Sequence, residues 1–470
     1  MRITQVAIRP TEASEAAGRP ALTPELLAAT GARYSRSGDG LDAILEKIDP
    51  ANLDRSVDSI FKMIDYGHQS IADMAPVALF IDGISIWLAY HIWALCPTAG
   101  GQESSTRYIR FEPQTLLPAD PLGIPESDVA HWRDLMAQCL AAFDTAYAAW
   151  LKLGETYPEL TRIPEDLRSD PSGRAQKRLE RMERNYAFDR ARYLLPAALA
   201  TNLMLVMSAR GWTQLCQQLL SHPLPEAKTV GAAIRAELGL AAPRLLRHAT
   251  ETESIARGIQ AELEARAAIA AAESESLLAP GAALFERSPT PILDIRLPSG
   301  ASPSDLAADL RFHDNRYAWI GATMQRTMVR FGWEAVALAE LRDLNRHRSG
   351  SKYSPLVPRG FYAAADQLPA GSALEPDLRR WSEPGRAASY EALVRLRRAD
   401  PTSVYWMALG TQVAFEHCTA ADRFIYEAEL RTGLGAHFRY ARHLHDALAL
   451  WFERFPETRG LVIEGAAEPE

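Results

Sequence analysis

The segment Glu340-Leu-Arg-Asp-Leu-Asn-Arg-His-Arg-Ser-Gly-Ser351 places several donor-rich side chains at the end of an apolar run. That run, Ala335 to Leu344, has apolar residues at intervals of two to three, which predicts a helix with one buried face. The Ser-Gly-Ser sequence predicts that the helix stops after Arg348. The gathered donors, which suit a phosphate or a flavin ring, are Arg342, Arg346, His347 and Arg348. Alternatively, these basic residues only offset the helix dipole.

Length and composition predict a soluble chain of two or three domains. The chain has 470 residues, of which 47% are hydrophobic and 23% charged, and its net charge is −8. Because the basic residues form no long run, we expect no general nucleic-acid binding. The four cysteines form no Cys-x-x-Cys pair, which favours a reducing cytoplasm. The apolar stretch from Pro76 to Cys96 contains polar residues and predicts a buried core element, not a membrane span.

Helical periodicity dominates the chain, with a few strand-like segments. We expect strands near the N-terminus, at Val77–Ile81 and at Thr327–Phe331. Five prolines between residues 278 and 304 predict a linker between two halves. The long helical segments are predicted at 54–63, 84–95, 128–154, 175–220, 250–276, 390–430 and 437–455.

The two halves resemble a diverged duplication. Phe80-Ile-Asp-Gly-Ile-Ser, followed by a helix, parallels Phe331-Gly-Trp-Glu-Ala-Val, followed by the helix that ends in Arg-His-Arg. Ser208-Ala-Arg210 similarly parallels Ala421-Asp-Arg423. The period exceeds 200 residues, which indicates duplicated domains and excludes a solenoid.

These motifs together resemble the flavin-dependent thymidylate synthase family. Arg346-His-Arg-Ser-Gly-Ser351 fits its Arg-His-Arg-x-x-Ser signature. Further segments resemble its other motifs in the family's order: Gly67-His68-Gln-Ser70-Ile-Ala-Asp73, Gln102-Glu103-Ser-Ser105-Thr-Arg107-Tyr108, Ala191-Arg192-Tyr-Leu-Leu-Pro196, Ser208-Ala-Arg210 and Glu429-Leu-Arg431. The resemblance covers roughly residues 55–235 and 315–455.

Each half retains a different set of these motifs. The first half has Ala94-Leu-Cys96 where the signature would stand, and the second has Trp406 in place of the Ala-Arg arginine. In the family, each site is built between subunits that contribute complementary sets. The resemblance therefore implies one composite active site per chain and one degenerate site.

The resemblance also implies a reaction and its cofactors. FAD, reduced by NADPH, would mediate one-carbon transfer from methylenetetrahydrofolate to C5 of a uracil-type nucleotide, converting dUMP to dTMP or acting on a related pyrimidine. The catalytic residues would be Arg346, Arg192, Arg431 and Ser105. Substrate would bind to Glu103, Ser105, Arg107, Arg192, Arg346 and Arg431, and the flavin to His68, Ser70, Asp73, Arg210, Arg346, His347, Arg348 and Ser351.

Several residues depart from the family pattern. Asp343 stands where the family has a neutral amide that faces the nucleotide, and Asp73 is shorter than the usual Glu. These changes leave the identity of the pyrimidine open. Two alternatives remain: a non-catalytic scaffold that binds a flavin or nucleotide, and a metal site at His437, His443, His445 and Asp446, for which a solvated helix is the simpler interpretation.

The expected architecture is α+β and helix-rich, with two thymidylate-synthase-like halves that each carry a small antiparallel sheet covered by long helices and pack as a pseudo-dimer. The predicted divisions are an N-terminal half at 1–245, a connector and linker at 246–304 and a C-terminal half at 305–470. By resemblance, two chains would form a homodimer of pseudo-dimers.

Overall fold

The structure is a computed structural model, and it describes residues 1–470 except 39, 49–56, 59–69, 109–112, 283–284 and 469–470. The chain forms two compact units that interleave along the sequence. Unit 1 contains residues 1–105, 117–124 and 199–263, and unit 2 contains 106–116, 125–198 and 264–470. The predicted domains were continuous segments with boundaries after residues 245 and 304. The two units differ from them, because residues 125–198 group with the C-terminal part of the chain.

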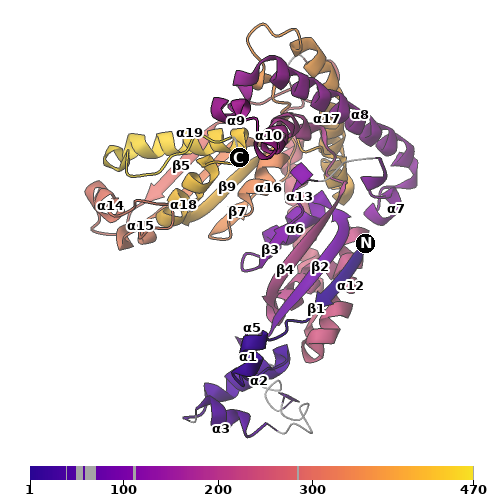
Figure 1. The fold of residues 1–470 in the computed structure, drawn as a ribbon. Helices are drawn as coiled ribbons and strands as arrows, with labels where there is room; N and C mark the ends of the chain where they lie inside the picture. The colour runs from indigo at the N-terminus through magenta and orange to yellow at the C-terminus, as the bar shows by residue number, and fades with distance from the viewer. Residues whose placement is uncertain (39, 49–56, 59–69, 109–112, 283–284, 469–470) are drawn as a thin grey trace. The chain divides into compact units, whose positions relative to one another are not determined.

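Unit 1 is built on a four-stranded antiparallel sheet in the order β1-β2-β4-β3. Helices α11 and α12 pack on this sheet and on each other (Figure 1). Its strands are β1 Arg2–Val6, β2 Pro76–Ser85, β3 Gly100–Glu103 and β4 Ala200–Ser208, and its main helices are α2 Pro24–Tyr34, α5 Ser70–Asp73, α6 Ile86–Leu95, α11 Ala209–Leu220 and α12 Pro225–Ala241.

Unit 2 is built on a second antiparallel sheet in the order β5-β6-β9-β7, with β8 also paired to β9. Helices α18 and α19 lie beside this sheet, and the long helices α8, α10 and α17 pack together (Figure 1). The strands are β5 Pro291–Arg296, β6 Met328–Ala337, β7 Ser351–Tyr353, β8 Gly360–Phe361 and β9 Thr411–Ala420. The main helices are α8 Glu126–Thr156, α10 Gly173–Ala191, α14 Pro303–Leu310, α15 Ala322–Arg326, α16 Leu338–Leu344, α17 Glu375–Leu396, α18 Ala421–Thr432 and α19 Phe438–Arg454.

The predicted helix-rich α+β class with two sheet-bearing halves is confirmed. The predicted strands at the N-terminus, 77–81 and 327–331 are confirmed as β1, β2 and β6, and the helix expected at 250–276 is α13 Glu253–Ala272. The apolar stretch 76–96 forms β2 and α6, both largely buried. Among the helices in the described part of the chain, none has both the length and the apolar composition of a transmembrane span. The helix predicted at 54–63 lies largely outside the described residues.

Three sequence-based assignments are wrong. Residues 200–208 and 411–420, predicted as helix, are the central strands β4 and β9, and part of the predicted linker is strand β5. Buried residues alternate along both central strands with a period of two, which is the strand period. The adjoining helices α11 and α18 begin at the next residue, so each apolar pattern continues from strand into helix without a break.

The two sheets share strand order and pairing register. Pro76 pairs with Ser208 in unit 1, and Met328 pairs with Ala420 in unit 2. Each long strand has a register shift near its end, between Asp82 and Ile84 in β2 and between Trp333 and Val336 in β6. Consequently β2 positions correspond to β6 positions with a shift of 252 residues. Positions in β4 and α11 correspond to those in β9 and α18 with a shift of 212.

Candidate active site

The Arg-His-Arg segment lies in a turn after α16. The helix begins only at Leu338, because residues 335–337 still belong to β6. It ends at Leu344, so the predicted helix from 335 through Arg348 is wrong at both ends. The backbone N–H of Arg346 donates to the carbonyl of Asp343 and that of His347 to Leu344, each at 3.3 Å. Strand β7 then begins at Ser351. We refer to residues 346–349 as the Arg-His-Arg turn.

This turn presents one exposed cation and one buried ring. The side chain of Arg346 is 38% exposed, and its Nη1 lies 3.5 Å from Oδ1 of Asp343. His347 is buried, and its Nε2 accepts a 2.8 Å hydrogen bond from Nε of Arg431 on α18. Burial is the largest cause that lowers the pKa of His347 to about 3, so the ring is neutral at pH 7. The Nζ of Lys352 donates to the His347 carbonyl.

Arg192, from the first half of the sequence, reaches this turn within unit 2. Its Nη2 lies 3.1 Å from Oδ2 of Asp343, and both side chains are largely buried. The position of Arg192 is fixed by backbone pairing just after it: the N–H of Gly410 donates to the Tyr193 carbonyl and that of Leu409 to the Leu195 carbonyl. These residues lead directly into β9, so the two halves of the sequence meet in one compact unit.

Asp343 is the carboxylate on which these arginines converge. Burial alone raises its pKa, but Arg346, Arg192 and Arg431 together hold the pKa well below its usual range. Arg192 and Arg346 thus share one counter-ion, and the Nε of Arg431 donates to an uncharged ring. The arrangement concentrates forked donors at one place, as recognition of an anionic, planar ligand requires.

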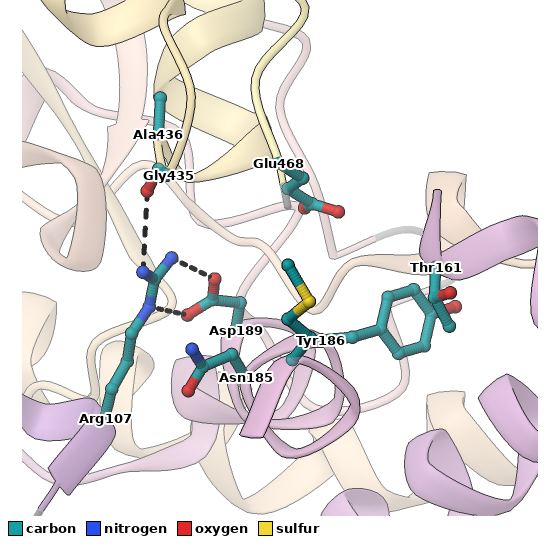
Figure 2. Close-up of a pocket in the computed structure, with 9 residues that line it drawn as sticks. Arg107, Thr161, Asn185, Tyr186, Asp189, Gly435, Ala436 and Glu468 are labelled. Atoms are coloured by element: carbon teal, nitrogen blue, oxygen red, sulfur yellow. Dashed lines mark hydrogen bonds and ion pairs between the residues drawn. The ribbon is translucent and has the colours of Figure 1, made fainter. Parts of the chain in front are cut away.

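Arg107 lies in the same unit but points at a carboxylate of its own. Its Nε and Nη2 donate to Asp189 at 3.0 and 2.5 Å, and its Nη1 lies 3.5 Å from the Gly435 carbonyl (Figure 2). The pair borders a small pocket whose lining includes Asn185, Tyr186 and Glu468. Coulombic attraction to Asp189 is the largest cause that raises the Arg107 pKa. A phosphate would have to compete with Asp189 for these donors.

Other predicted site residues belong to unit 1. Asp73 on α5 accepts from Nη1 of Arg210 at 2.9 Å and from Oγ of Ser208 at 3.3 Å, so three motif residues form one cluster. Ser70 starts α5 and is exposed. Glu103 ends β3 and is half-buried, as is Ser105 two residues later. His68 lies outside the described residues.

In unit 2 the remaining predicted residues surround the turn. Arg348 is half-buried and Ser351 is exposed at the start of β7. Of the predicted set, unit 2 contains Arg107, Arg192, Arg346, His347, Arg348, Ser351 and Arg431. Unit 1 contains Ser70, Asp73, Glu103, Ser105 and Arg210.

The histidines of the metal alternative have other partners. His437 caps α19 by accepting from the N–H of Arg439, and its Nε2 lies 3.2 Å from the Asp189 carbonyl. His443 is buried with its ring against Trp333, so this face of α19 is core and the simpler interpretation as a solvated helix is wrong. The described residues include no group of three or more His, Cys, Asp or Glu side chains placed to hold a metal ion.

Four residues beside the site were missed by sequence reasoning. Asp189 and Glu340 are buried carboxylates that bind Arg107 and the hydroxyl of Tyr193, the latter at 2.7 Å. His417 on β9 and Glu427 on α18 form a buried pair behind the turn. A strand assignment for residues 411–420 would have placed His417 on the buried face, because it alternates with Phe415 and Thr419.

The family match follows the motifs. Residues 21–244 match the model of the family described as thymidylate synthase complementing protein. This match confirms, over residues 21–244, the resemblance predicted from the motifs.

Two curated proteins are similar to slightly less than half of this chain. A UPF0159 protein of Thermoplasma acidophilum is 24% identical over 234 residues, which cover 46% of this chain and 46% of that protein. A UPF0159 protein of Chlamydia pneumoniae is 27% identical over 228 residues, which cover 44% of this chain and 41% of the relative. The chain therefore spans less than half the length of these relatives. Among solved structures, a UMP/dUMP methylase PolB from Streptomyces cacaoi bound with 5-Br dUMP aligns with a TM-score of 0.33 and 15% identity, covering 53% of this chain and 93% of that chain.

Proposed function

We propose that the chain is a flavin-dependent one-carbon transferase that acts on C5 of a uracil-type nucleotide, with its working site built around the Arg-His-Arg turn of unit 2. The observation that carries this proposal is that Arg192 and Arg346 pair with the single carboxylate of Asp343, while Arg431 binds the neighbouring ring of His347. The family match over residues 21–244 supports the reaction class.

The arginines have distinct tasks in this proposal. Arg192 and Arg431 donate to the pyrimidine and stabilise negative charge on the ring as C5 becomes nucleophilic. Both guanidiniums are held by buried partners, Asp343 and His347, so their orientation is set before substrate binds. Arg346, the more exposed of the three, is accessible to an anionic group of the substrate or cofactor.

Ser105, Arg107 and Glu103 complete the nucleotide site in the proposal. Ser105 and Arg107 would bind the 5′-phosphate, and Glu103 would orient ribose hydroxyls. Because Arg107 is paired with Asp189, phosphate binding through this residue requires an exchange of partners.

The residues of the turn fit a flavin. FAD carries an anionic pyrophosphate and a planar ring, which suit the forked donors of Arg346 and Arg348 and the hydroxyl of Ser351. His347 would contribute a neutral ring. Ser70, Asp73, Arg210 and His68 would add further contacts. When bound, FAD supplies the redox chemistry, with NADPH as reductant and methylenetetrahydrofolate as carbon donor.

We further propose that the two halves arose by tandem duplication and that one site per chain survives. The shared strand order, register and strand irregularities of the two sheets support a common origin. Packing as a pseudo-dimer, a homodimer of such chains and a cytoplasmic location remain part of this proposal.

The direct test is release of tritium from [5-³H]dUMP by the full chain, with FAD, NADPH and methylenetetrahydrofolate present. We expect release that depends on FAD. The variant Arg431→Leu should abolish it; leucine is the residue that unit 1 carries at the corresponding position, Leu219. Parallel assays with [5-³H]UMP and other pyrimidine nucleotides identify a different acceptor. Absence of release with every pyrimidine, despite FAD binding, would favour the scaffold alternative.

A further inference from the structure

A buried histidine–carboxylate pair lies behind the Arg-His-Arg turn. Nδ1 of His417 on β9 lies 3.0 Å from Oε2 of Glu427 on α18, and the two side chains are 0% and 1% exposed. Nε2 of His417 lies 2.7 Å from the Ser349 carbonyl, and Oε1 of Glu427 lies 3.9 Å from Nε2 of His347. The pair therefore reaches the turn at two points, residues 347 and 349.

Hydrogen-bond partners fix the tautomer of one ring beside this pair. Nδ1 of His417 faces the Glu427 carboxylate, and its Nε2 lies within hydrogen-bond distance of the Ser349 carbonyl. The Nε2 of His347 accepts from Arg431, so the proton of this neutral ring is on Nδ1. A fixed tautomer of His347 in turn fixes the direction of the Arg431 guanidinium.

Unit 1 shows that the fold does not need this polar set. With the shifts of 212 and 252 residues between the units, the four polar positions each correspond to a leucine. His417 corresponds to Leu205, Glu427 to Leu215, Arg431 to Leu219 and, by residue count after β6 and β2, His347 to Leu95. Leu205, Leu215 and Leu219 are at most 2% exposed.

This substitution pattern bears on why the polar set is retained. Replacing a buried ion pair by hydrophobic residues of similar volume is often neutral or stabilising, by about 1–4 kcal/mol. In unit 1, the corresponding strand β4 and helix α11 carry buried leucines at these positions. Stability of the fold therefore does not explain the polar residues of unit 2.

We propose that His417 and Glu427 are positioning residues that hold the Arg-His-Arg turn and the His347–Arg431 hydrogen bond in the geometry needed to bind the anionic ligand. Neither residue touches the ligand in this account. The inference rests on the proposed function for its catalytic consequence, but its structural part concerns the turn alone.

The test is the double variant His417→Leu/Glu427→Leu in the full chain, which installs the residues of unit 1. We expect an unchanged or higher Tm, affinity for dUMP lowered roughly tenfold to a hundredfold, and kcat lowered as well. Selective ¹⁵N-histidine NMR should show His347 in the Nδ1–H tautomer in the wild type and a mixture of tautomers in the variant.

A matched control is available on the same helix. Nε2 of His313 lies 2.8 Å from Oε1 of Glu429, and both side chains are fully buried. Glu429 also accepts from the N–H of Ile463. The variant His313→Leu/Glu429→Leu should lower Tm and leave the His347 tautomer and dUMP affinity unchanged.

Glu427→Gln covers the case in which the double variant does not fold. The amide retains the size of the side chain and removes the charge beside the two rings, so it should fold and still shift the ¹⁵N signals of His347. A His347 signal that is unchanged in Glu427→Gln or in the double variant would overturn the proposal. If the wild type binds no dUMP and turns over no nucleotide, the proposed function fails, whereas the NMR comparison still decides the positioning role.

Discussion

At the scale of single residues, Asp343 determines the electrostatics of the site. Its carboxylate is shared by Arg192 and Arg346, at 3.1 and 3.5 Å, and Arg431 also lowers its pKa. A sequence comparison identifies Asp343 only as an acidic departure from a neutral amide. The structure shows that the acid is largely paired within the protein, so it need not repel the phosphate of a nucleotide.

Asp343→Asn should therefore alter both stability and binding. Loss of the carboxylate leaves Arg192 buried without its counter-ion, at a cost of roughly 3–5 kcal/mol in the free energy of unfolding. The same change releases the Arg192 guanidinium that Asp343 orients, and the affinity for dUMP should fall by about 1 kcal/mol, or roughly fivefold. Calorimetric titration with dUMP measures the affinity, and unchanged affinity in a folded variant would contradict the assigned geometry.

His437 predicts a pH dependence of stability. Burial, and then Arg192, lower its pKa to about 3 from an ordinary value of 6.5. Between those values the unfolded chain binds more protons than the folded one, so stability falls as pH falls, by up to about 1.4 kcal/mol per pH unit. His437→Asn retains a helix-capping side chain and removes the titration. Its free energy of unfolding should decline less steeply from pH 6.5 to 4.5 than that of the wild type, in which His347 and His437 both contribute.

At the scale of elements, the turn after α16 depends on a glycine that only the structure explains. Gly350 has φ of 71°, and a Cβ there would collide with the Cys418 carbonyl on β9. The sequence predicted a helix that continues to Arg348 and stops at Ser-Gly-Ser, but the helix ends at Leu344. The pairing of β7 with β9 brings the Cys418 carbonyl next to residue 350, so only glycine fits there. The local sequence cannot reveal this contact, because Cys418 is far from Gly350 in the chain.

Gly350→Ala should consequently lower the free energy of unfolding by more than the backbone strain alone would. Gly371 provides a control, because its φ of 73° is nearly the same and a Cβ there would meet nothing within 4 Å. We expect Gly371→Ala to lower the free energy of unfolding by about 1 kcal/mol, and Gly350→Ala to lower it by roughly 3 kcal/mol, since β7 must move away from β9. Urea denaturation of the two variants measures the difference, and equal losses would contradict the close approach of residues 350 and 418.

The strands that sequence reasoning missed follow one rule. Residues 200–208 and 411–420 lie directly before the amphipathic helices α11 and α18, and their alternation is short. A window of a dozen residues averages the period of two with the helical period that follows. The long helices and the α+β class were predictable, because long periodic segments dominate the chain. The strands β4 and β9 could be assigned only once their pairing partners were known.

At the scale of the whole molecule, the chain has two sheets of the same order and register but different chemistry. Unit 2 carries His347, His417, Glu427 and Arg431 where unit 1 has four leucines. The motifs identified which arginines to consider, because they occur in the family's order. The grouping of Arg107 and Arg192 with the C-terminal turn depends on the packing of residues 125–198 in unit 2, and no local pattern encodes that packing.

Visible absorption tests whether the chain is, as we propose, a flavoenzyme that acts on a uracil-type nucleotide. The spectrum of the purified protein with FAD would be recorded before and after anaerobic addition of NADPH, with and without dUMP. We expect a bound-flavin spectrum that NADPH bleaches. Addition of dUMP should shift this spectrum or speed its bleaching, and Arg431→Leu should remove the effect of dUMP while the flavin still binds. A protein that remains colourless after incubation with FAD and gel filtration would contradict it.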